Sequence, residues 1–144
     1  ALEAGVAAHA DWTIAAQLNG DFTQAKAYEE TIAYLQSSPA PDVVYCENDN
    51  MCFGVMQALD ELGIAYGDGS VTLISFDAGR TALSYCKDGK IDLCAECNPL
   101  HGPRVRALIK QLARGETPEK LSYMPEALFT ADTLTAELLE SRVY

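Results

Sequence analysis

The chain alternates between short apolar runs rich in β-branched residues and longer segments whose apolar residues recur every three or four positions. This succession is typical of βα units, so we expect an open α/β fold with a mainly parallel sheet and helices on both faces. We expect strands at residues 12–17, 42–46, 71–76, 91–97 and 121–130. Helices are expected at residues 2–9, between Asp21 and Ser38, between Asn50 and Gly63, and at residues 81–87, 103–114 and 133–141.

Length and charge limit what this fold can do. With 144 residues, of which 49% are apolar, the chain can bury a single domain core. Its 10 Lys and Arg residues face 21 Asp and Glu residues, which gives a net charge of −11. Such an excess of negative charge opposes contact with a phosphate backbone, so we expect no nucleic acid partner.

Polar side chains follow the ends of the predicted strands. Ligands of open parallel sheets collect at the carboxyl ends of the strands, so these residues should share one edge. They are Asn19 and Asp21, then Asn48 and Asp49, then Asp77, and last Glu96 and Asn98. For Asp21 and Asp49 we favour helix capping, whereas Asp77 and Glu96 directly end apolar strands and need a polar cleft or solvent.

The residue types at this edge suit an uncharged ligand. Planar amides and carboxylates each engage two neighbouring hydroxyl groups, as a sugar presents them. Phosphate ligands call for a glycine-rich loop of the form GxGxxG or GxxxxGK[ST], and neither motif occurs in the chain.

The signals for catalysis are weak. Only His9 and His101 are present, and no GxSxG or HExxH motif occurs. We expect no catalytic residue, no metal and no cofactor, and hence no enzyme.

The cysteines could point to another chemistry. Cys94 and Cys97 form a CxxC pattern, and a redox or zinc site at this pair is the alternative reading. Residues three apart on a strand point to opposite faces, so we favour structural thiols that are buried, Cys94 above all. The same burial is expected for Cys46, Cys52 and Cys86.

Three segments, in order, carry a family resemblance: 45–54 (YCENDNMCFG), 74–78 (ISFDA) and 95–99 (AECNP). The chain resembles the C-terminal lobe of type I periplasmic sugar-binding proteins, the ribose- and galactofuranose-type receptors of ABC importers. Within this family, the Asn-Asp-x-Met-Ala-x-Gly turn has an alanine where this chain has Cys52. The resemblance implies a Rossmann-like lobe.

The resemblance also implies a set of ligand-binding residues. Asn48, Asp77 and Glu96 match positions that hydrogen-bond sugar hydroxyls, although the ribose-type pattern has glutamine at the position of Glu96. Phe22 matches a position where an aromatic ring packs on the sugar, and its alternative role is to pack on its own helix. Asn98 is a neighbouring candidate.

The same resemblance suggests how the chain divides. Residues 1–98 would form the sugar-binding lobe, 99–120 a crossover helix that packs on a missing N-terminal lobe, and 121–144 a returning strand and helix. The apolar stripe from Val105 to Leu112 would then be exposed, so we expect a homo-oligomer formed through it.

The function implied is that of a solute-binding component of an ABC-type sugar importer. It would bind a monosaccharide without covalent chemistry and deliver it to a membrane permease, from the periplasm or from a lipid anchor on the cell surface. The alternative is the effector-binding domain of a LacI-type transcription regulator, which has the same fold.

Overall fold

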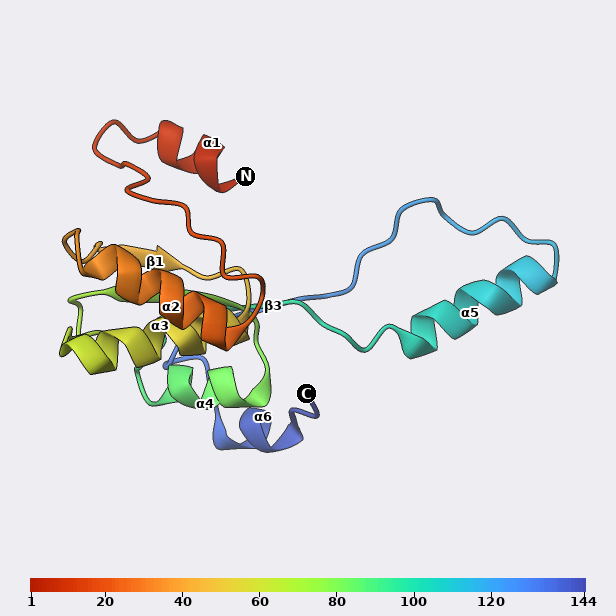
Figure 1. Cartoon of the computed structure of the whole chain (residues 1–144). Coiled ribbons are helices and arrows are strands. Elements are labelled where there is room, and N and C mark those ends of the chain that lie inside the picture. The colour runs from red at the N-terminus through yellow and green to blue at the C-terminus, as the bar shows by residue number, and fades with distance from the viewer.

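The computed structural model describes residues 1–144 and contains one four-stranded sheet with six helices around and beyond it (Figure 1). The strands are β1 (Val43–Tyr45), β2 (Thr72–Asp77), β3 (Leu93–Glu96) and β4 (Leu128–Phe129). The helices are α1 (Leu2–Ala7), α2 (Gln24–Leu35), α3 (Asp49–Leu62), α4 (Arg80–Lys87), α5 (Gly102–Ala113) and α6 (Ala136–Ser141).

The sheet has the order β1-β2-β3-β4. Strands β1, β2 and β3 are parallel, whereas β4 runs antiparallel to β3. The predicted α/β fold with a mainly parallel sheet is therefore confirmed. No helix has both the length and the apolar character needed to cross a membrane.

The core lies between one face of the sheet and helices α3 and α4. Leu73 of β2 and Cys94 of β3 are fully buried there, together with Leu59 of α3 and Leu83 of α4. Helix α2 packs along α3, and α6 packs on α4. A close packed core of this kind holds the strand ends in fixed positions.

Apolar side chains on the opposite face of the sheet remain accessible. Val43 is 51% exposed and Leu128 is 65% exposed, while Ile74 and Phe76 are half-buried. Helix α1, which precedes this sheet in the chain, makes no extensive contact with any other element and lies apart from it (Figure 1).

Local hydrogen bonding sets the helix ends. The side chain of Asn48 accepts a hydrogen bond from the Met51 amide and caps α3, and Gly63 ends that helix with φ of 66°. The expected capping of α2 by Asp21 is wrong, because Thr23 accepts the hydrogen bond from the Lys26 amide.

The strand predicted at residues 12–17 is not formed. This segment lies between α1 and α2 without pairing with any strand, and Trp12 in it is 57% exposed. A β-rich run becomes a strand only when a neighbouring strand supplies the partners for its backbone groups. The ring of Trp12 instead stacks on His9, with centroids 4.3 Å apart.

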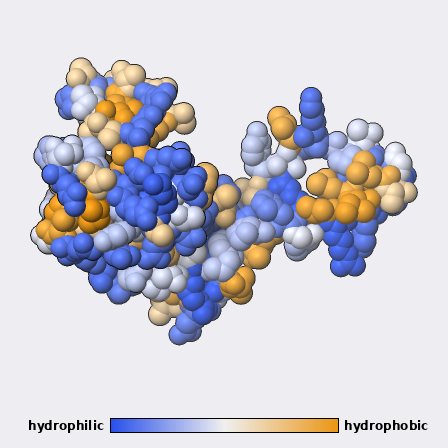
Figure 2. Space-filling view, in the orientation of Figure 1, coloured by the Kyte–Doolittle hydropathy of each residue, from blue (hydrophilic) through white to orange (hydrophobic).

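The strand predicted at residues 121–130 is limited to the two residues of β4, since only these reach the edge of β3. Residues 97–127, which include α5, extend away from the sheet and return to it (Figure 1). No residue of α5 is buried. The predicted exposure of its apolar stripe is seen at Val105, Ile109 and Leu112, which are 48%, 60% and 61% exposed, and Figure 2 shows apolar surface on this outlying part.

Candidate functional site

The parallel strands bring their polar C-terminal residues to one edge of the sheet, which we call the rim. Asn48 follows β1, Asp77 ends β2 and Glu96 ends β3. Asp77 and Glu96 are register partners across β2 and β3, and the Cys97 amide donates to the Asp77 carbonyl at 3.3 Å. The three residues therefore come from adjacent strands, as the parallel topology predicts.

A turn from the N-terminal part of the chain joins the rim next to β1. The side-chain amide of Asn48 donates to the carbonyl of Phe22 at 3.2 Å. A Cβ on Gly20 would lie 2.6 Å from the sulfur of Met51, so this turn packs tightly against the start of α3. The ring of Phe22 is 65% exposed, so it is not held against its own helix.

Asp49 does not cap a helix, in contrast to our expectation. Its carboxylate is buried, and it accepts hydrogen bonds from the Ser75 hydroxyl at 2.5 Å and from the Gly79 amide at 2.8 Å. Burial raises the pKa of Asp49, and these two hydrogen bonds oppose that rise. Asp49 thereby joins α3 to β2 and to the turn before α4.

That turn has an unusual backbone. Asp77 has φ of 98° and Ala78 has φ of 58°, in the region where residues with a Cβ are strained. Desolvation raises the pKa of the Asp77 carboxyl, yet its side chain is exposed and takes part in no ion pair. The exposed Asp77 carboxylate thus keeps acceptor sites open to a ligand.

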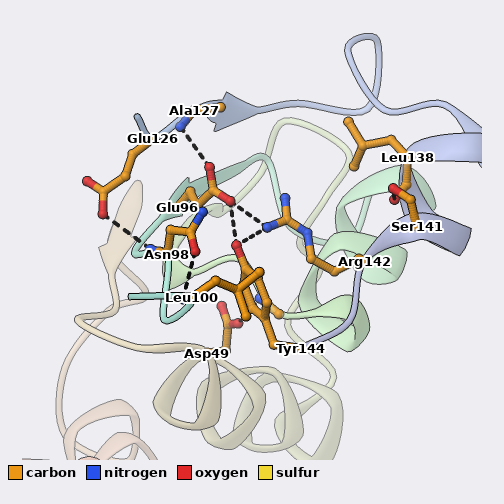
Figure 3. Close-up of polar contacts among 11 residues, drawn as sticks. Asp49, Glu96, Asn98, Leu100, Glu126, Ala127, Leu138, Ser141, Arg142 and Tyr144 are labelled. Atoms are coloured by element: carbon orange, nitrogen blue, oxygen red, sulfur yellow. Dashed lines mark hydrogen bonds and ion pairs between the residues drawn. The ribbon is translucent and has the colours of Figure 1, made fainter. Parts of the chain in front are cut away.

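Glu96 is engaged by other parts of the protein. Its Oε1 accepts hydrogen bonds of 2.5 Å from the Arg142 guanidinium and of 2.5 Å from the Tyr144 hydroxyl, and its Oε2 accepts one of 3.1 Å from the Ala127 amide (Figure 3). Desolvation opposes ionisation of Glu96, but these donors outweigh it and lower its pKa.

Sequence reasoning missed Arg142 and Tyr144. The Arg142 guanidinium also donates to the Tyr144 hydroxyl, and the Tyr144 carbonyl accepts a 2.7 Å hydrogen bond from the Arg80 amide at the start of α4. Arg142 lies 46 residues from Glu96 in the chain. No local pattern could have related them.

Asn98 completes the rim beyond β3. Its side-chain oxygen accepts a hydrogen bond from the Leu100 backbone amide, and its backbone amide donates to the Glu126 carboxylate. Asn98, Glu96, Arg142 and Tyr144 help to line a shallow hollow of about 200 Å³. A larger hollow of about 400 Å³ lies beside Tyr66 and Lys90, and contains none of the rim residues.

The cysteines are reduced and mostly buried. Cys46, Cys52, Cys86 and Cys94 are in the core, as expected. Cys97 is exposed, which corrects the expectation of burial: it lies just past β3, where no helix covers the chain.

The rim offers hydrogen-bond acceptors from Asp77 and an aromatic face from Phe22. Such a combination can hold hydroxyl groups and the apolar face of a sugar ring. No group of three or more His, Cys, Asp or Glu side chains is arranged to hold a metal ion.

Comparisons with known proteins find a matching family and similar relatives. The family model described as a periplasmic binding protein domain matches residues 1–116. The galactofuranose-binding protein YtfQ of Escherichia coli is 32% identical over 124 residues, which cover 83% of this chain and 39% of that protein. The fructose import binding protein FruE of Bifidobacterium longum is 32% identical over 83 residues, which cover 58% of this chain and 24% of that protein. The chain thus spans well under half the length of these relatives.

Solved structures are similar over nearly the whole chain. A Mycobacterium smegmatis protein in complex with β-D-fucofuranose is 32% identical, with a TM-score of 0.82 and coverage of 90% of this chain and 42% of that one. The binding component of the arabinose ABC transporter from Shewanella sp. ANA-3, bound to L-arabinofuranose, is 25% identical, with a TM-score of 0.85 and coverage of 99% and 51%.

Proposed function

The chain belongs to the family of periplasmic binding protein domains, and we propose that it is one sugar-binding lobe of a solute receptor that serves an ABC-type importer. This is a family of extracytoplasmic solute-binding proteins rather than of enzymes. The named relatives favour an import receptor over an effector-binding domain of a transcription regulator. In this proposal the ligand is a monosaccharide and the partner is a membrane permease.

The observation that carries the proposal is the juxtaposition of Phe22, Asn48 and Asp77. Asn48 is hydrogen-bonded to the Phe22 backbone, and Asp77 ends the strand next to β1. The exposed residue Phe22 is therefore held by its backbone beside the rim that carries the exposed Asp77. The ring would cover the apolar face of a sugar while the carboxylate accepts its hydroxyls.

The described residues supply only one wall of such a site. A rim that is open on one side buries little of a ligand, whereas ligand sites bury most of it. The apolar stripe of α5 would contact the part of the receptor that encloses the sugar from the other side. We therefore expect this chain alone to bind sugar weakly, with a dissociation constant in the millimolar range.

An NMR titration tests the proposal. The ¹⁵N-labelled chain is titrated with L-arabinose, D-galactose and D-fructose, and separately with inorganic phosphate. We expect sugar-dependent amide shifts at Phe22, Asn48 and residues 77–79. Phosphate should shift none of these amides.

Matched variants assign the effect to the rim. Asp77→Asn should weaken the sugar-dependent shifts, whereas Asp11→Asn, in an exposed segment away from the rim, should leave them unchanged. The proposal fails if no sugar shifts the rim amides at concentrations well above the expected millimolar dissociation constant, or if Asp77→Asn binds like the unmodified chain.

A further inference from the structure

The ion pair between Arg142 and Glu96 is built differently from an ordinary surface pair. Both side chains are only 9% exposed, and their atoms approach to 2.5 Å. The Arg142 guanidinium also lies over two aromatic rings, 5.2 Å from that of Phe129 and 4.6 Å from that of Tyr144. Stacking and burial hold the guanidinium in one orientation.

A second pair in the same chain provides a contrast. Arg114 and Glu116 approach to 2.6 Å, but their side chains are 61% and 50% exposed. Exposed pairs of this kind contribute little because water screens them. A buried charge that loses its partner is far less tolerable, so Arg142 and Glu96 depend on each other.

These contacts determine what Glu96 can offer to a ligand. A carboxylate has about four acceptor sites, and three protein groups already use Glu96: Arg142, Tyr144 and the Ala127 amide. About one site remains for a ligand hydroxyl. The negative charge of Glu96 is balanced by Arg142 before any ligand arrives.

We propose that Arg142 and Tyr144 are specificity-determining residues of the rim. Both fix the orientation of the Glu96 carboxylate, and Arg142 balances its charge. The site therefore selects an uncharged sugar over a cationic amino sugar. This inference rests on the proposed sugar-binding function. The two added residues, Arg142 and Tyr144, lie in the segment after α6 and donate hydrogen bonds to Glu96 (Figure 3).

The charges around Glu96 support this selectivity. The guanidinium of Arg142 and the phenol of Tyr144 contact its carboxylate, and its register partner Asp77 ends the neighbouring strand with an exposed side chain. The Glu126 carboxylate lies nearby and accepts a hydrogen bond from the Asn98 backbone amide. Loss of the Arg142 charge would leave carboxylates in excess at the rim, and such a site attracts cations.

The test compares D-galactose with D-galactosamine at neutral pH by NMR titration of the full chain. The unmodified chain should bind D-galactose in preference to D-galactosamine. Arg142→Gln should shift the ratio of the two dissociation constants toward D-galactosamine by about tenfold, the change expected for one unbalanced charge. Arg142→Lys keeps the charge and should recover most of the original preference.

A second readout follows Glu96 itself. The ¹³C shift of its side-chain carboxyl is recorded against pH in the unmodified chain, in Arg142→Gln, in Tyr144→Phe and in the control Arg114→Gln. The pKa of Glu96 should rise in Arg142→Gln, rise less in Tyr144→Phe, and stay unchanged in Arg114→Gln. Arg142→Lys, recorded in the same way, keeps the positive charge and should leave the pKa of Glu96 close to that in the unmodified chain. If Arg142 acted through packing alone, the loss of its charge in Arg142→Gln would not raise this pKa.

The outcomes separate the two proposals. If the unmodified chain binds D-galactose and Arg142→Gln keeps the same preference, the inference is overturned while the sugar-binding function stands. If neither sugar shifts any rim amide of the unmodified chain, the proposed function fails and the selectivity falls with it. A Glu96 pKa that is the same with and without the Arg142 charge also overturns the inference.

Discussion

The buried carboxylate of Asp49 accepts a 2.8 Å hydrogen bond from the backbone amide of Gly79, which lies 30 residues further along the chain. This bond connects the first turn of α3 with the strained turn that carries Asp77. The position of a candidate ligand-binding residue therefore depends on a side chain that is itself buried.

Asp49→Ala should destabilise the fold. It leaves the Ser75 hydroxyl and the Gly79 amide without their acceptor, and we expect the free energy of unfolding to fall by about 3 kcal/mol. Urea denaturation measures this loss. Asp11→Ala, in an exposed segment, should change the stability by less than about 0.5 kcal/mol, and an equal loss in both variants would contradict the assignment.

Gly54→Ala should separate α2 from α3. A Cβ at this position would collide with the Gln24 carbonyl and lie 2.8 Å from the Tyr28 nitrogen. Overpacking of this kind costs about 1–3 kcal/mol, more than the roughly 1 kcal/mol that alanine gains in helix propensity. We expect Gly54→Ala to lower the melting temperature. Gly5→Ala should not lower it, because Gly5 has open space around it.

Stability should depend on pH in opposite directions through Glu96 and Asp49. The pKa of Glu96 is lowered in the folded protein, so its contribution is present above the ordinary value of 4.5 and is lost as the pH falls through the folded pKa. The stability advantage of the unmodified chain over Glu96→Gln should therefore shrink on acidification.

The pKa of Asp49 is instead raised above 3.8. The folded state then binds the proton more tightly, so the advantage over Asp49→Asn should grow as the pH falls through the raised pKa. Denaturation of both variants at several pH values checks the two signs, and parallel trends would refute the contrast.

Thiol alkylation should be confined to Cys97 in the folded protein. Cys97 is exposed, whereas the other four cysteines are buried. The neighbouring thiol of Cys46, together with burial, holds the pKa of Cys52 well above its usual range, so little thiolate is available there. Mass spectrometry after brief iodoacetamide treatment should find one modified cysteine, and five after denaturation; rapid labelling of Cys52 would show that the core is open.

The apolar stripe of α5 should drive self-association. Ile109 and Leu112 are 60% and 61% exposed, and each square ångström of apolar surface removed from water contributes about 25 cal/mol. Sedimentation should show an oligomer for the unmodified chain and a monomer for the double variant Ile109→Glu and Leu112→Glu. Lys110→Gln is the control on the same helix; a strictly monomeric unmodified chain would refute the prediction.

The sequence alone determined the α/β class, most helices and the residues that end each parallel strand. Apolar periodicity and capping residues are local signals, and parallel topology places strand ends together whatever their separation in the chain. The sequence therefore suffices to assign Asn48, Asp77 and Glu96 to one edge of the sheet.

Tertiary structure decided what each of those side chains does there. The pairing of Glu96 with Arg142 spans 46 residues, and the absence of a strand at residues 12–17 depends on whether a neighbouring strand is present to pair with it. Hydrogen bonds, ion pairs and desolvation depend on distances in space, and no spacing along the chain encodes those distances.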